Sequence, residues 1–160
     1  MTFESGGYEM QRQSPIELEG LEVYLQPSMT SQQEWNIVYS RIKEYIKNLA
    51  DEDIVLYPEK TTIDRIIKSC HIHIQIKRSF TTDVILLYRD LSDYLNQEET
   101  LILLAVANEH GKVSTPLIID LIVLIESVIP GTIIINGYLH TSDWGKSLQR
   151  LQNQDMLFFK

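Results

Sequence analysis

Hydrophobic residues recur at helical spacing in two long segments of the chain. In residues 30–53 the apolar and aromatic positions would share one face of an amphipathic helix: Trp35, Val38, Tyr39, Ile42, Tyr45, Ile46 and Leu49. Ser31 and Glu34 have the spacing of a capping box, which favours a helix start at Ser31. The run PLIIDLIVLIESVI (116–129) is apolar almost throughout and begins with proline, which is favoured in the first helical turn. We therefore predict an amphipathic helix and, later in the chain, a buried one.

Shorter segments also have helical spacing. TTIDRIIKS (61–69) fits a brief helix, and FTTDVILLYRDLSDYLNQ (80–97) fits a longer one. SDWGKSLQRLQNQDMLFF (142–159) predicts a final helix that turns three side chains inward, namely Trp144, Leu148 and Leu151. The apolar segment 97–111 fits a helix or a strand, and its glutamates and alanines favour the helix.

Other segments alternate between apolar and polar residues. Residues 16–26 predict one or two short strands around Gly20, and residues 53–58 predict a short strand that ends at Pro58. The clearest alternation is CHIHIQIK (70–77). Because side chains of a strand point alternately to its two faces, one face is assigned to the core: Cys70, Ile72, Ile74 and Ile76. The opposite face carries His71, His73, Gln75 and Lys77.

The segment 132–141, TIIINGYLHT, predicts a tight β-hairpin. Asn136 and Gly137 stand between two apolar runs, and Asn-Gly is the preferred pair for a two-residue type I′ turn. Helices and strands interleave along the chain, so we expect a single compact domain of α/β or α+β class. That domain would span residues 16–160 and follow a flexible tail at residues 1–15, which are polar and lack a period.

Composition narrows the classes of function. Apolar residues make up 44% and charged residues 22%, as in ordinary globular proteins, so extensive disorder is not expected. The single cysteine cannot form an intramolecular disulfide, and no secretory signal or membrane-spanning run is evident. We therefore expect a soluble cytoplasmic protein that does not bind membranes.

The net charge of −8 indicates the sign of a partner. A field of this sign disfavours nucleic acid and anionic lipid, and it favours a basic protein or serves solubility alone. The last three predicted helices loosely resemble a winged helix, but the final one has only Lys146 and Arg150 as bases. A winged-helix regulator is therefore a minor alternative.

The histidines are the residues best suited to metal or proton-transfer chemistry. His71 and His73 lie two apart on one predicted strand face, so their imidazoles could bind one metal ion. The sequence order supplies no obvious third ligand, and a solvated strand face is the favoured explanation of the pair. Cys70, on the predicted apolar face, is expected to be an inert thiol with a raised pKa. No cofactor is predicted, because no phosphate-binding loop or other cofactor motif occurs.

A hydrolase is the second class of function. The sequence His-Thr-Ser at residues 140–142 resembles one of the two His-x-Ser/Thr motifs of two-histidine phosphoesterases. That resemblance would make His73, His140 and Ser142 candidates for catalysis. The other half of the pattern is missing, because His73 is followed by isoleucine and Gln75, which has no hydroxyl group.

The first hypothesis is a protein-binding module, an inhibitor or immunity-type protein that blocks a basic partner such as a nuclease-type toxin. Acidic side chains would take the positions of substrate phosphates and aromatic residues would anchor the contact. The predicted partner-binding residues are Glu17, Glu19, Glu22, Asp51, Glu52 and Asp53. This hypothesis leans away from an enzyme without excluding one. An assembly subunit or a homo-oligomer stays open as a further alternative.

Overall fold

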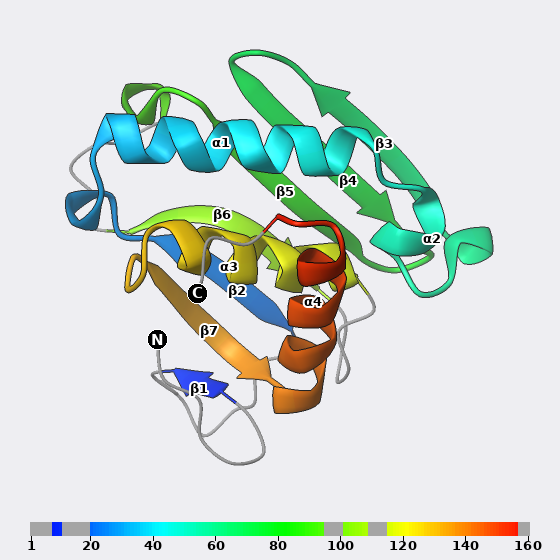
Figure 1. The fold of residues 1–160 in the computed structure, drawn as a ribbon. Helices are drawn as coiled ribbons and strands as arrows, with labels where there is room; N and C mark the ends of the chain where they lie inside the picture. Colours follow the sequence, from blue (N-terminus) through cyan, green and yellow to red (C-terminus); the bar gives the residue numbers. More distant parts are fainter. Residues whose placement is uncertain (1–7, 11–19, 95–100, 109–114, 157–160) are drawn as a thin grey trace.

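The computed structural model describes residues 8–10, 20–94, 101–108 and 115–156, without the side chains of residues 8–10 and 138. Over these residues the chain has an α+β fold: one antiparallel sheet with helices packed on it (Figure 1). The strands are β1 (Tyr8–Met10), β2 (Leu21–Leu25), β3 (Thr62–Ile67), β4 (His71–Lys77), β5 (Thr82–Tyr88), β6 (Ile102–Ala107) and β7 (Ile133–Leu139). The helices are α1 (Gln32–Lys47), α2 (Asp51–Ile54), α3 (Pro116–Val128) and α4 (Thr141–Asn153), with short 3-10 turns η1 (Pro27–Met29), η2 (Pro58–Lys60) and η3 (Leu91–Asp93).

The order of strands in the sheet is β1-β7-β2-β6-β5-β4-β3. Strands β3 to β6 follow one another as an antiparallel meander, whereas β7 returns after α3 to pair with β2. The last strand, β7, therefore lies between the first two strands, β1 and β2 (Figure 1).

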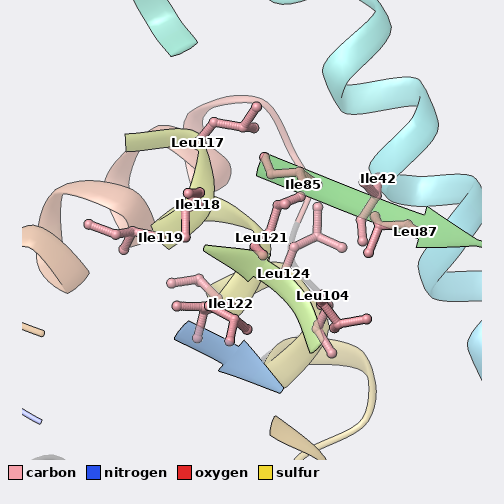
Figure 2. Close-up of a cluster of buried hydrophobic side chains, with 14 of the residues drawn as sticks. Ile42, Ile85, Leu87, Leu104, Leu117, Ile118, Ile119, Leu121, Ile122 and Leu124 are labelled. Carbon is pink, nitrogen blue, oxygen red and sulfur yellow. The ribbon is translucent and has the colours of Figure 1, made fainter. Parts of the chain in front are cut away.

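The long helices α1, α3 and α4 all lie against the same face of the sheet (Figure 1). Alternate residues of the strands point toward these helices and are buried, as in β4, where Ile72, Ile74 and Ile76 have no exposed surface. In Figure 2, side chains of α3 lie against Ile85 of β5 and Leu104 of β6, with Ile42 of α1 beside them. Burying each such side chain stabilises the fold by roughly 1.5–3 kcal/mol, so this layer holds the helices to the sheet.

A buried carboxylate links the three helices. Asp120 of α3 has no exposed surface and accepts hydrogen bonds from Tyr45 of α1 (2.6 Å) and from Ser147 of α4 (2.6 Å). Arg150 of α4 forms an ion pair with the same carboxylate. The donors from two neighbouring helices explain why a charged residue lies in this apolar layer.

Several predicted elements are confirmed. Helix α1 begins with the predicted capping box, in which the Ser31 hydroxyl accepts from the Glu34 N–H and the Glu34 side chain accepts from the Ser31 N–H. Helix α3 begins at Pro116, and α4 buries Trp144 and Leu151. Strand β2 lies in the segment 16–26, and β4 alternates as predicted.

The predicted hairpin at residues 132–141 is wrong, because β7 runs through it without a turn. A type I′ turn needs a positive φ at both central residues, and here only Gly137 has one, at 127°. Asn136 instead donates a hydrogen bond to Glu22 (2.9 Å) on the neighbouring strand. A Cβ atom on Gly137 would lie 2.5 Å from the carbonyl oxygen of Gly20, so the glycine serves a close approach of two strands.

Three segments for which we predicted or favoured helices contain strands instead. The segments 61–69 and 80–97 contain β3 and β5, and the segment 97–111 contains β6. Runs such as VILLY are apolar at nearly every position, so they fit either period, and pairing with neighbouring strands decides between them. Because β6 replaces the first helix of the winged-helix alternative, that alternative is wrong. The predicted strand at 53–58 is also wrong, since this segment holds the end of α2 and the start of η2.

Two further predictions concern Cys70 and the N-terminal tail. Cys70 precedes β4 and lies exposed in the turn that follows β3, where the Lys68 N–H donates to the His71 carbonyl (2.9 Å). The prediction of a buried thiol is therefore wrong. In the predicted tail, Tyr8–Met10 lie in the sheet as β1, and residues 1–7 and 11–15 lie outside the described residues.

Candidate functional site

The face of the sheet opposite the helices is not covered by any described element (Figure 1). We call it the open face. Its side chains come from β2 to β7, and none of them is buried: Glu22, Tyr24, Thr62, Asp64, Ile66, His71, His73, Gln75, Lys77, Thr82, Val84, Leu86, Tyr88, Leu103, Val106, Ile134 and Asn136. An antiparallel sheet with one solvated face usually alternates apolar inside and polar outside. Several of these side chains depart from that rule.

One row of side chains across the open face is almost entirely apolar. The pairing of strands places Ile66 opposite His73 and His73 opposite Leu86. Further along the sheet, Leu103 lies opposite Tyr24, and Tyr24 lies opposite Ile134. We call these six residues, one from each of β2 to β7, the apolar row.

The apolar row retains considerable contact with solvent. The side chain of Ile66 is 43% exposed and that of Leu103 is 44% exposed, and the other four are half-buried. Single exposed apolar residues are common on protein surfaces, but a continuous apolar strip is typical of an interaction site. The row therefore has the character of a surface that another molecule covers.

A second row lies one step along the strands and carries the acidic residues of the open face. It consists of Asp64, Gln75, Val84, Val106, Glu22 and Asn136, which pair across the strands in this order. We call it the carboxylate row. Asp64 forms an ion pair with Lys77 (2.9 Å), so its charge is compensated within the sheet.

Glu22 differs from the other acidic side chains of β2 to β7. Asp64 and Asp83 each have a basic partner, Lys77 and Arg78 respectively, at 2.9 and 2.8 Å. Among the described residues Glu22 has no such cation, although its Oε1 atom accepts a hydrogen bond from the Asn136 amide at 2.9 Å. Burial, and after it the charge of Glu22, raises the pKa of the neighbouring Tyr24 phenol. Glu22 is thus an oriented carboxylate whose charge is not neutralised by a described side chain.

A depression of about 800 Å³ adjoins the carboxylate row. It is lined by Gly20, Leu21, Glu22, Gln75, Phe80, Thr81, Thr82, Val84, Val106, Ala107 and Asn108. Phe80 projects from the turn between β4 and β5 and is 99% exposed. The depression joins an apolar floor to one carboxylate and several uncharged polar groups.

The predicted acidic residues do not form one patch. Glu22 lies on β2, whereas Asp51, Glu52 and Asp53 lie exposed on α2, and Glu17 and Glu19 fall outside the described residues. Helix α2 is held by Arg65 of β3, which donates to the Leu49 carbonyl (2.7 Å) and to Asp51 (2.7 Å). Because β2 and β3 are four strand spacings apart, Glu22 and Arg65 are separated by about 19 Å across the sheet. The structure therefore presents at least two separate acidic surfaces.

The histidines are also dispersed. His71 and His73 lie on the open face as predicted, whereas His140 is exposed at the start of α4, directly after β7. Strands β4 and β7 are four spacings apart, about 19 Å, so His73 and His140 do not share one site. Ser142 lies exposed in the first turn of α4. Over the described ranges, no three histidine, cysteine or acidic side chains gather where a metal ion could be held.

The structure places Cys70 beside an imidazole, which the sequence interpretation missed. The Cys70 sulfur lies 3.5 Å from Nδ1 of His71 at the start of β4, and the centroid of the His71 ring lies 6.2 Å from that of Tyr88. The tyrosine at position 39 reaches the same turn and donates a hydrogen bond to the Lys68 carbonyl (2.8 Å). Burial raises the pKa of Tyr39 to about 12, so its phenol is a hydrogen-bond donor at neutral pH.

Apart from His73, the residues of the apolar row were not predicted as site residues. Tyr24, Leu86, Leu103 and Ile134 stand in four separate apolar segments, and nothing in the local sequence indicates that they share a face. A correct assignment of β5 and β6 as strands would have been needed first, and the order and register of the strands as well. Phe80, the first residue of the predicted helix at 80–97, gave no signal beyond its apolar character.

Comparison of the chain with known proteins found no matching family model, no similar curated protein and no similar solved structure. No helix within the described ranges combines the length and the apolar character needed to cross a bilayer.

Proposed function

We propose that the protein is a binding module that docks a basic protein on the open face of its sheet. The observation that carries this proposal is the apolar row, to which six strands each contribute one solvent-accessible side chain. Protein interfaces combine an apolar, aromatic centre with a polar rim. Tyr24 and Leu103 would supply the centre, and the carboxylate row would supply one side of the rim.

Charge favours a basic partner. The chain carries a net charge of −8, and Glu22 adds a carboxylate beside the apolar row that no described basic side chain compensates. A basic surface would be steered toward this face and would be matched in sign once bound. A second copy of the same chain would bring two charges of −8 together, so self-association through this face is disfavoured.

In its most specific form, the proposal is an inhibitor of the immunity type that acts in the cytoplasm. Carboxylates such as Glu22 would occupy the positions at which a nuclease-type partner binds substrate phosphates. The apolar row would supply most of the affinity. Asp51, Glu52 and Asp53 remain predicted partner-binding residues and lie on a separate surface. Glu17 and Glu19 remain predicted contacts as well.

Site-specific photo-crosslinking tests the proposal. A photoreactive phenylalanine at Leu103 would be compared with the same residue at Ile37, which is similarly exposed (47% against 44%) but lies on α1. The proteins encoded beside the gene are the first partners to test. We expect a discrete crosslink to a basic protein from position 103 and none from position 37.

The salt dependence of the purified complex provides the second readout. We expect the association rate constant to fall steeply as ionic strength rises, because charge steers the encounter. Equal crosslinking from both positions, or a partner that is acidic and binds independently of salt, would contradict the proposal.

A further inference from the structure

The depression beside the carboxylate row has the chemistry of a pocket for one side chain. Val84 and Val106 pair across β5 and β6 and form an apolar surface within it. Glu22 is its one acidic lining residue. Of the lining residues that the structure describes, none is a lysine or an arginine.

Two described basic residues at the end of β4 are engaged elsewhere. Lys77, at the end of β4, is bonded to Asp64 at 2.9 Å. Arg78, which follows it, forms an ion pair with Asp83 at 2.8 Å and donates to the Thr115 hydroxyl at 2.8 Å. Asp83 is among the residues of β5 buried toward the helices, so Arg78 is directed away from the open face. Glu22 is left as the charge that a ligand would meet.

The Glu22 carboxylate is already oriented for a ligand. Asn136 holds one of its oxygens with a neutral N–H donor at 2.9 Å, which fixes the group without cancelling its charge. A carboxylate has about four acceptor positions, so it can accept further hydrogen bonds. Phe80, which is 99% exposed, adds an aromatic ring at the rim of the depression.

We propose that this depression receives an arginine side chain of the basic partner. The aliphatic stem would lie on Val84 and Val106, the guanidinium group would bond to Glu22, and its plane would stack on Phe80. Arginine fits better than lysine because a guanidinium group is planar, weakly hydrated and able to stack on an aromatic ring while it bonds to a carboxylate. This inference rests on the proposed function and assigns to the partner an arginine at the centre of its docking surface.

The probe is N-acetyl-L-arginine N-methylamide, titrated into the ¹⁵N-labelled full-length protein and followed by NMR. Its control is the citrulline analogue, which has the same shape but no charge. We expect saturable shifts of the amides of Glu22, Val84 and Asn108 with the arginine probe, with a Kd in the millimolar range, and no saturable shifts with the citrulline analogue.

Variants distinguish arginine binding in the depression from binding to other acidic residues. Glu22→Gln keeps an acceptor for Asn136 and should weaken arginine binding at least fivefold. Phe80→Ala changes an exposed residue, leaves the fold intact, and should weaken binding two- to fivefold. Glu44→Gln, an exposed change on α1, is the matched control and should leave the Kd unchanged. Equal binding of both probes, or arginine shifts centred on Asp51, Glu52 and Asp53, would overturn the inference.

The crosslinked partner distinguishes this inference from the proposed function. A partner whose affinity depends on Leu103 but not on Glu22 would leave the binding module in place and refute the arginine pocket. Arginine binding that requires Glu22 would support the pocket even if no protein crosslinks to position 103, in which case the proposed function alone fails.

Discussion

Leu103 of β6 lies directly opposite Tyr24 of β2 on the face of the sheet that no described helix covers. The two residues are far apart in sequence, and each is one of several apolar positions in its own strand. Their pairing joins the apolar side chains of β6, β2 and β7, which lie on the same face as those of β3 to β5. The proposed function depends on this row.

The close approach of Gly137 to Gly20 predicts a large effect of a small substitution. Gly137→Ala would place a Cβ atom 2.5 Å from the Gly20 carbonyl oxygen and force a non-glycine residue into a φ of 127°. We expect the free energy of unfolding to fall by about 2–4 kcal/mol, as measured by urea denaturation.

The matched control for that substitution is Gly145→Ala. Gly145 lies exposed within α4, and a Cβ atom there would meet nothing within 4 Å. Since alanine is a better helix former than glycine, we expect this variant to be more stable by about 0.5–1 kcal/mol. A destabilising effect of similar size at both positions would contradict the close strand approach described for Gly137.

The hydrogen bond from Tyr45 to Asp120 predicts a specific loss of stability. Tyr45→Phe removes one donor from a buried carboxylate and leaves the ring in place. We expect a loss of about 1.5–3 kcal/mol, which is typical of a hydrogen bond to a charged group. Tyr57→Phe is the control, because Tyr57 is 56% exposed, and its free energy of unfolding should stay within about 0.5 kcal/mol of the wild-type value.

The burial of Asp120 predicts an unusual dependence on pH. Burial raises its pKa above 3.8, although Arg150, Ser147 and Tyr45 oppose the shift. The folded protein therefore binds this proton more tightly than the unfolded chain, so the contribution of Asp120 to stability is greatest at low pH and declines as pH rises through the folded pKa.

Comparison with Asp120→Asn isolates this titration, because asparagine does not ionise. Urea denaturation gives the free energy of unfolding of both proteins between about pH 4 and pH 7. We expect the wild type to become more stable relative to Asp120→Asn as the pH falls. If the wild type instead became less stable relative to the variant at low pH, Arg150 would outweigh burial and lower the pKa of Asp120.

The sequence allowed some parts of the fold to be predicted and not others, for physical reasons. The capping box of Ser31 and the alternation of Ile72, Ile74 and Ile76 are local signals, and both are confirmed. The run VILLY in β5 is apolar at every position, so only its pairing with β4 distinguishes a strand from a helix. Asn136 and Gly137 match a turn by residue type, but contacts with β2 decide their conformation.

The candidate site was even less accessible from the sequence. Glu22 was predicted as a partner-binding residue from its charge alone, and that role stays a prediction. The apolar row depends on four strand pairings: Ile66 with His73, His73 with Leu86, Leu103 with Tyr24, and Tyr24 with Ile134, the last two between residues distant in the chain. A row of this kind becomes visible only when the order and the register of the strands are known.

The measurement that tests the central claim most directly is the affinity of the crosslinked partner for Leu103→Asp and Ile37→Asp. Both substitutions replace an apolar side chain of nearly equal exposure, one on the open face and one on α1. The open-face account predicts at least tenfold weaker binding, about 1.4 kcal/mol, for Leu103→Asp and less than a twofold change for Ile37→Asp, with both variants folded by circular dichroism. Undiminished binding of Leu103→Asp, or an equal loss in both variants, would contradict it.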